Sequence, residues 1–370
     1  MNPSKLPPLP RVAVNLPALR HNLESLLSLC SSGGIEVAIV TKVVCADPQI
    51  VRLIEESGAH YYADSRWENL RSISKTVPQS IKPKILLRLS GASQVEEVVR
   101  YSQASLESEA QTIAALGAEA ERQNKIHKII LMIDLGDLRE GIYSTERQRI
   151  LETATLVARH PHLELWGVGV NLTCYGSIIP DEDNLGELVE IAHWLRRELS
   201  LPIPVVSGGN SSSLFLISEG RMPSGVNHLR LGESFTLGND TANCCLFPGL
   251  REDTFTLEAE IVELQTKPSK PRGKSGANAF GEKVEYVDRG LQRRAILALG
   301  RQDINAENLI PLDPQIEILG ASSDHLLLNL SACQIPYQLG DVIRFRLDYG
   351  NLLRTFTSPY INRYYLSEED

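Results

Sequence analysis

The sequence lacks several features that mark whole classes of protein. No stretch approaches about 18 uninterrupted apolar residues, so no membrane span is predicted. Residues 1–11 hold four prolines and no apolar core, so they do not resemble a signal peptide. The six cysteines are scattered, without a CxxC pair or a Cys/His spacing typical of metal sites. We expect them to be reduced thiols of a cytoplasmic protein, with no bound metal.

Positive charge is also in short supply. The chain has 37 Lys and Arg against 46 Asp and Glu, a formal net charge of -9. This balance argues against a general binder of nucleic acid or of anionic membranes. The hydrophobic content of 42% and charged content of 22% are those of an ordinary globular protein. A length of 370 residues favours one large domain and a smaller one.

The first two thirds of the chain alternates short β-rich runs with stretches of helical periodicity. Several helical stretches open with Asp, Ser or Asn and end near Gly, as capped helices do. Strands separated by helices pair in parallel, and eight such units favour a closed (β/α)₈ barrel, the TIM barrel, over an open doubly wound sheet. The expected strands are residues 36–42, 60–65, 84–90, 104–108, 128–136, 164–172, 203–210 and 229–238.

The pattern changes after about residue 245. Segments such as "TFTLEAEIVELQT" alternate apolar and polar residues with period two, and long helical periods vanish. We therefore expect an α/β fold with a barrel over residues 11–245 and a mainly antiparallel β domain over residues 246–370. A strand at residues 11–15 falls outside the count of eight and can join the β domain instead.

Polar residues gather where the predicted barrel strands end, which is where such barrels form their active sites. Lys42 ends the first strand, and Arg139 follows the fifth. The segment 171–175 ends the sixth, 207–213 ends the seventh, and 230–233 lies in the eighth. These side chains are expected to share one rim of the barrel.

The segment 207–213 and the residue Lys42 each have both an ordinary and a functional explanation. "SGGNSSS" can be a glycine turn with a serine cap, or a set of N–H and hydroxyl groups that binds an anion. Lys42 can be a surface lysine, or it can form a Schiff base with an aldehyde. One rim would then carry a lysine, two arginines and a turn able to bind an anion. This combination indicates a cofactor that is anionic and carries a reactive carbonyl. Pyridoxal phosphate fits this description.

Long segments of the sequence match a known family in order, from about residue 11 to 362. The chain resembles the fold-type III pyridoxal-phosphate enzymes, and among them the ornithine racemase branch of the alanine/ornithine racemase family. The matching segments are "VTKVVCADPQI", "ADSRWENL", "KIILMIDLGDLREGIY", "NLTCYGSIIP", "SGGNSSSLFL", "HLRLGE", "LALGRQDI", "IEILGASSDHL" and "LDYGNLLRTFTSPY".

The resemblance implies roles for individual residues. Lys42 would hold pyridoxal 5'-phosphate covalently and act as one of two catalytic bases. Arg139 would lie near the cofactor's phenolic oxygen and the substrate carboxylate, and Arg230 would face the pyridine nitrogen. Asn171 aligns with a histidine that often stacks on the ring. The residues expected at the phosphate are Ser211, Gly232, Glu233 and Tyr349, the last from the β domain.

The resemblance also implies a reaction and an assembly. Arginine stays cationic, so Arg230 would keep the ring nitrogen unprotonated and make the ring a weaker electron sink. That suits racemisation, where a proton leaves one face of Cα and returns to the other, better than decarboxylation. We expect an amino-acid racemase acting on ornithine, in a homodimer with shared active sites. The alternatives are racemisation of lysine, arginine or alanine, and a non-enzymatic pyridoxal-phosphate carrier.

The second catalytic base stays open at this point. In alanine racemases it is a tyrosine of the partner's β domain, but the corresponding stretch "GKSGANAFGEK" contains none. The tyrosine usually found four residues after the lysine is replaced by Ala46. The residues considered for the second base are Tyr286, His325, Cys174 and Asp303.

Overall fold

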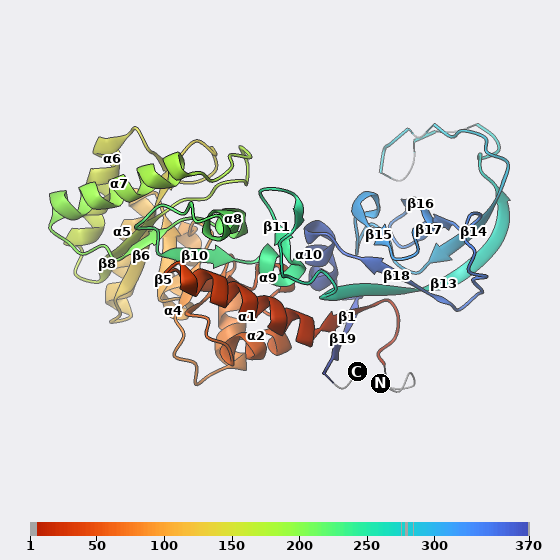
Figure 1. Cartoon of the computed structure of the whole chain (residues 1–370), viewed down its shortest axis with the longest axis horizontal. Coiled ribbons are helices and arrows are strands. Elements are labelled where there is room, and N and C mark those ends of the chain that lie inside the picture. Colours follow the sequence, from red (N-terminus) through yellow and green to blue (C-terminus); the bar gives the residue numbers. More distant parts are fainter. Residues whose placement is uncertain (1–5, 275, 278–279, 284, 369–370) are drawn as a thin grey trace. The chain divides into compact units, whose positions relative to one another are not determined.

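The structure is a computed structural model that describes residues 6–274, 276–277, 280–283 and 285–368. It divides the chain into two compact units (Figure 1). One unit is Ala18–Glu252, and the other combines the chain up to Pro17 with the chain from Asp253 onward. No helix within the described ranges is long and apolar enough to cross a membrane.

The larger unit is a closed barrel of parallel strands. Each strand pairs in parallel with the next one along the chain, and the last, β10, pairs with the first, β2, through Arg230 beside Ala38. The predicted (β/α)₈ barrel is therefore confirmed. Its strands are β2 (Glu36–Val40), β3 (Tyr61–Asp64), β4 (Lys84–Leu86), β5 (Ala104–Glu107), β6 (His127–Asp134), β8 (Leu163–Gly169), β9 (Val205–Ser207) and β10 (His228–Leu231).

Helices follow these strands, and local signals explain where several of them begin. Asp47 caps α2 by accepting hydrogen bonds from the N–H groups of Gln49 and Ile50, and Pro48 occupies the first turn. Asp181 and Asn184 form a capping box at the start of α7. The helices are α1 (Leu16–Ser32), α2 (Pro48–Glu55), α3 (Trp67–Thr76), α4 (Val95–Tyr101), α5 (Ala110–Arg122), α6 (Arg147–Arg159), α7 (Glu182–Leu199), α8 (Leu214–Ser218) and α9 (Glu233–Leu237).

All eight expected barrel strands end earlier in the structure, and two of these differences concern the site. The first strand ends at Val40, and Lys42 opens the 3-10 turn η2 (Lys42–Val44). The eighth strand ends at Leu231 rather than at residue 238, because the following apolar run forms the short helix α9. The last four residues of α9 are all buried, so their pattern reads equally well as a strand or as a buried helix.

The barrel interior is packed rather than hollow. One buried cluster takes residues from seven of the eight strands: Ala38, Val40, Ala63, Ile85, Ala104, Leu106, Ile130, Met132, Trp166 and Val205. Close packing requires glycine at Gly167, where a Cβ atom would lie 2.5 Å from the carbonyl oxygen of Val205. Burial of each large apolar side chain contributes about 1.5–3 kcal/mol. Because side chains fill the interior, the space for a ligand lies at the ends of the strands.

The smaller unit is mainly an antiparallel sheet, as the period-two pattern predicts. Its main path runs in the order β15-β18-β13-β14-β17-β16. The N-terminal strand β1 (Arg11–Asn15) pairs antiparallel with β13 and parallel with β19. The other elements are β13 (Phe255–Pro268), β14 (Leu291–Leu297), β15 (Ile310–Pro311), β16 (Glu317–Ala321), β17 (Leu326–Asn329), β18 (Val342–Arg346), α10 (Tyr349–Thr357) and β19 (Asn362–Leu366).

The chain leaves the barrel unit for the smaller unit between Glu252 and Asp253, whereas the sequence pattern changes at about residue 245. A short hairpin of β11 (Asn239–Asp240) and β12 (Cys245–Leu246) lies where the sequence pattern changes, and residues 247–252 continue the barrel unit after it. After it, the N–H of Arg251 donates to the side-chain oxygen of Asn22 at 2.7 Å. This bond holds the chain against the barrel unit up to the junction.

Candidate active site

The structure brings five predicted site residues to one end of the barrel. Each of them lies at or just beyond the carboxyl end of a parallel strand, and these ends share one rim. Lys42 follows β2, Arg139 follows β6, Asn171 follows β8, Ser211 follows β9 and Arg230 lies within β10.

Lys42 lies beside a buried carboxyl group that the sequence analysis missed. The hydroxyl of Thr41 donates to Oδ2 of Asp64, at the end of β3, over 2.6 Å. Burial raises the pKa of Asp64, while its hydrogen bonds and the positive charge of Lys42 act in the opposite direction. Asp64 therefore lies within electrostatic reach of the Lys42 ammonium.

The turn after Lys42 has an unusual backbone. Cys45 and Ala46 have φ angles of 48° and 50°, so two successive residues other than glycine are left-handed. Such conformations cost about 1–3 kcal/mol each and persist where the surroundings enforce them. Ala46 is buried here. The strained turn fixes the direction in which the chain leaves Lys42.

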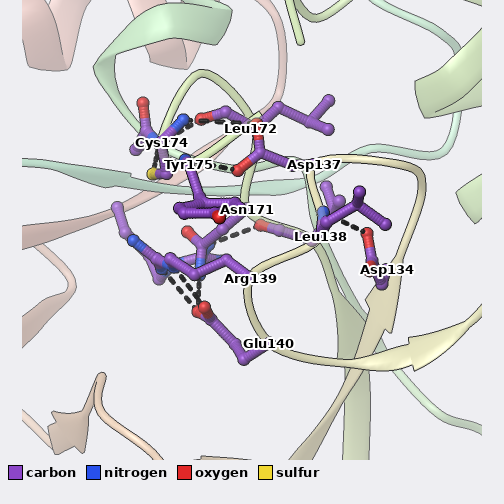
Figure 2. Close-up of polar contacts among 12 residues, drawn as sticks. Asp134, Asp137, Leu138, Arg139, Glu140, Asn171, Leu172, Cys174 and Tyr175 are labelled. Atoms are coloured by element: carbon purple, nitrogen blue, oxygen red, sulfur yellow. Dashed lines mark hydrogen bonds and ion pairs between the residues drawn. The ribbon is translucent and has the colours of Figure 1, made fainter. Parts of the chain in front are cut away.

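The two arginines are joined through Glu140 and Asn171. Figure 2 shows Arg139, Glu140 and Asn171 directed toward one another. The guanidinium of Arg139 donates from Nε and Nη2 to the two carboxylate oxygens of Glu140. The side-chain amide of Asn171 donates to the same carboxylate. Nη2 of Arg230 then donates to Oδ1 of Asn171 at 2.7 Å.

Arg230 is buried with several hydrogen-bond acceptors. Besides Asn171, it donates to the carbonyl oxygen of Val170 at 2.6 Å and to the hydroxyl of Ser207. Since Arg230 can only donate, the Ser207 hydroxyl is left to donate to Nδ1 of His228, 2.7 Å away. Burial lowers the pKa of Arg230 to about 10, which leaves it cationic at neutral pH.

The turn after β9 forms a polar cradle. Ser211 opens the 3-10 turn η4 (Ser211–Ser213), and Asn210 caps it by accepting from the N–H of Ser212. The Ser211 hydroxyl lies 3.0 Å from that of Ser234 in α9, so the turn meets the segment that contains Gly232 and Glu233. The Glu233 carboxylate accepts from the side-chain amide of Asn239 at 2.9 Å.

One hydroxyl in this cradle has no partner among the described residues. Oγ of Ser212 is buried without a hydrogen bond, although the side chain is only 1% exposed. Buried polar groups normally have partners, so this hydroxyl is available to bind a ligand or a water molecule. Oγ1 of Thr241, just beyond β11, is also buried and unpaired in the described structure.

A second residue missed in the sequence organises the rim loop after β8. The carboxylate of Asp137 accepts hydrogen bonds from the main-chain N–H groups of Cys174, Tyr175 and Ile178, at 2.9–3.3 Å. Figure 2 shows Asp137 beside Cys174 and Tyr175. Three such bonds clamp the loop to the segment that contains Arg139. The sequence signal for this carboxylate is the cluster of acids in "DLGDLREG", which does not by itself single out Asp137.

Cys174 is the one residue considered for the second base that lies in the barrel unit. Its sulfur accepts from the side-chain amide of Asn210 at 3.7 Å. Partial burial raises the pKa of its thiol, and the charges of Arg139 and Arg230 act in the opposite direction.

The other predicted residues belong to the smaller unit. Tyr349 begins α10, which Asp348 caps. Asp303 is buried and accepts from the hydroxyl of Ser358 at 2.6 Å. Tyr286 is exposed, and the main chain of His325 bonds to Ser322. A role for any of them at the site stays a prediction.

The fold and site together define a class of protein. The arrangement expected for an alanine racemase-like protein is a closed parallel barrel joined to an antiparallel β domain, with a lysine, two arginines and a polar cradle on one rim. Residues 14–240 match the family model described as "Alanine racemase, N-terminal domain". The chain belongs to this family.

Known relatives cover nearly the whole chain. It is 44% identical over 354 residues to ornithine racemase of Acetoanaerobium sticklandii, covering 96% of this chain and 99% of that one. It is 36% identical over 356 residues to lysine racemase of Thermotoga maritima, covering 96% and 98%. Alanine racemase of Bartonella henselae, solved with covalently bound pyridoxal phosphate, shares the fold. Its TM-score is 0.72 at 16% identity, covering 97% of this chain and 100% of that one.

Proposed function

We propose that this protein is a pyridoxal-phosphate-dependent amino-acid racemase that interconverts L- and D-ornithine. The observation that carries the proposal is the rim of the barrel, where Lys42, Arg139 and Arg230 share one end with a polar cradle that contains an unpaired buried hydroxyl. The 44% identity to an ornithine racemase over 96% of the chain supports the substrate.

The described residues fit the cofactor. Lys42 supplies the amine for its aldehyde, and Ser212 supplies a buried hydroxyl that needs a partner. Ser211, Tyr349 and the main-chain N–H groups of Gly232 and Glu233 are the other proposed phosphate ligands. When bound, pyridoxal phosphate makes the Cα–H bond of an attached amino acid acidic by accepting electron density.

Arg230 and Asn171 set the electrostatics of the cofactor ring. Hydrogen bonds to Val170, Asn171 and Ser207 hold the guanidinium of Arg230 in place. Because Arg230 is already protonated at neutral pH, it cannot accept a proton from a ligand. Facing the ring nitrogen, it would keep that nitrogen unprotonated. The ring is then a weaker electron sink, which favours prompt return of the proton to Cα.

Lys42 moves the proton on one face of the substrate, and Arg139 binds the substrate carboxylate. A bidentate guanidinium contact fixes the orientation of a carboxylate, which a racemase needs for both enantiomers. The group on the opposite face is Cys174, Tyr286, His325 or Asp303, and the proposed function does not depend on which. We further propose a homodimer in the cytoplasm, with active sites completed by both subunits.

The test is a chiral assay of the purified protein with L-ornithine, L-lysine, L-arginine and L-alanine. We expect a yellow protein that absorbs near ~420 nm and racemises ornithine fastest. Lys42→Ala should lose the absorption and the activity. A colourless protein that takes up no pyridoxal phosphate would refute the cofactor.

Lysine is the second substrate to consider, because of the 36% identity to a lysine racemase. A higher kcat/KM for lysine than for ornithine would reassign the substrate within the same reaction. A protein that binds the cofactor but racemises none of the four amino acids would instead be a carrier.

A further inference from the structure

Glu140 stands at the centre of the rim network, although it is not one of the residues that the proposed reaction uses. Three N–H groups converge on its carboxylate: Nε and Nη2 of Arg139, and Nδ2 of Asn171. Its side chain is only 11% exposed, against 43% for Arg139. The carboxylate is therefore more covered than the arginine that it binds.

The chemistry of the donors and acceptors allows one arrangement of Asn171. Its NH₂ group must face Glu140, which can only accept, and its oxygen must face Arg230, which can only donate. An inverted amide would place oxygen against carboxylate and NH₂ against guanidinium. Glu140 thus fixes the amide of Asn171, and the amide oxygen in turn holds Arg230.

Glu140 also fixes the plane of Arg139. The bidentate contact uses Nε and Nη2, and Nη1 takes no part in it. A guanidinium carries five donors in a rigid fork, so binding one edge orients the other. An anion such as a substrate carboxylate can be bound at the edge that bears Nη1.

We propose that Glu140 is a positioning residue of the racemase, which orients Arg139 directly and Arg230 through Asn171. This inference rests on the proposed function, since it assigns the two arginines to substrate and cofactor. One carboxylate then sets the geometry of both cationic groups, and its loss disturbs both together.

Glu140→Gln is the sharpest variant, because it keeps the shape and removes the charge. Glutamine offers one acceptor oxygen and a donating NH₂ group to three N–H donors, so at least one donor must turn away. We expect kcat/KM for ornithine to fall about 10- to 100-fold, the factor that a hydrogen bond to a charged group corresponds to. Glu140→Asp keeps the charge on a shorter side chain and should recover part of the loss.

The matched control is Glu146→Gln, the same chemical change in an exposed ion pair. Glu146 lies 3.4 Å from Arg149, and both side chains are about half exposed. Exposed pairs contribute little, so this variant should stay within about 2-fold of wild type. A similar loss in Glu146→Gln and Glu140→Gln would overturn the proposal.

Alanine separates positioning from recognition of the substrate side chain. If Glu140 positions Arg139, Glu140→Gln should lower kcat/KM for ornithine and for alanine by a similar factor. If Glu140 instead binds the distal ammonium of ornithine, only the ornithine reaction should suffer. Loss confined to ornithine would therefore refute the positioning role.

A structural measurement that does not depend on enzyme activity separates the positioning role of Glu140 from the proposed function. Crystal structures of the cofactor-free Glu140→Gln and Glu146→Gln proteins should show Arg139 and Asn171 reoriented in the first alone. If the wild type racemises nothing, the proposed function fails, while these structures still test the network. Arg139 and Asn171 unmoved in Glu140→Gln would refute it. If that variant does not fold, Glu140→Asp decides, and wild-type geometry and rates there would refute it.

Discussion

Glu107 offers a quantitative test of the barrel's electrostatics. It ends β5, is 1% exposed and accepts from the hydroxyl of Ser90 at 2.5 Å. Burial raises its pKa from 4.5 to about 7, and hydrogen bonds from Ser90 and Ser105 act in the opposite direction. Near neutral pH the folded chain thus holds a proton that the unfolded chain has released.

The sign and size of the effect follow from that difference. Between pH 4.5 and about 7 the Glu107 carboxyl holds its proton more fully in the folded state than in the unfolded state, so the contribution of Glu107 to stability falls as pH rises through this window. Each pH unit between the two pKa values corresponds to about 1.4 kcal/mol, so Glu107 destabilises the barrel by up to about 3 kcal/mol above pH 7. Glu107→Gln removes the charge and keeps an acceptor for Ser90.

We expect Glu107→Gln to be nearly neutral at pH 4 and to stabilise the barrel by about 2–3 kcal/mol at pH 8. Urea unfolding followed by tryptophan fluorescence measures this, because Trp67, Trp166 and Trp194 all lie in the barrel unit. Glu121→Gln, at an exposed position of α5, is the control. Parallel stability profiles for wild type and Glu107→Gln from pH 4 to 8 would refute the reasoning.

Three further predictions concern the rim and the buried histidines. Gly141 has a φ of 126°, and a Cβ atom added there would lie 2.5 Å from the main-chain N of Asp134. Gly141→Ala should therefore destabilise the protein by about 1–3 kcal/mol, measured by urea unfolding, and weaken cofactor binding, measured by fluorescence titration. Asp137→Ala should expose the loop of residues 173–178 to limited proteolysis, since three main-chain N–H groups lose their acceptor; an unchanged cleavage pattern would contradict this. Burial lowers the pKa of His127 to about 4 and that of His228 to about 3, so unfolding below about pH 6.5 takes up protons and acid should destabilise the barrel. In the same urea assay, the stability of His127→Gln should fall less steeply as the pH is lowered.

The barrel was predictable because its signals are local. Caps such as Asp47 and the alternation of strand and helix both lie within short windows of sequence. The end of the eighth strand could not be predicted in this way, because the apolar residues after Leu231 continue the run into α9. Whether such a run is strand or helix depends on the tertiary contacts that bury it.

Some rim residues could be predicted from the sequence, and others could not. Lys42 and Arg230 could be found because a barrel places strand ends on one rim. Glu140 could not, since an acid next to Arg139 in sequence is usually a surface neighbour of no consequence. Its importance comes from Asn171, which lies in a different loop and reaches the same carboxylate only in the folded chain.

The pairing of β1 has a consequence for synthesis on the ribosome. Arg11 lies beside Asn362 in the sheet, so the first strand to be made has one of the last as its neighbour. The barrel unit ends at Glu252 and can close while the rest of the chain is still being made. Until β13 and then β19 emerge, β1 is an unpaired edge tethered to a finished barrel. A nascent chain arrested before residue 362 should therefore carry a folded barrel and an incomplete sheet, which makes this strand the point most exposed to mispairing.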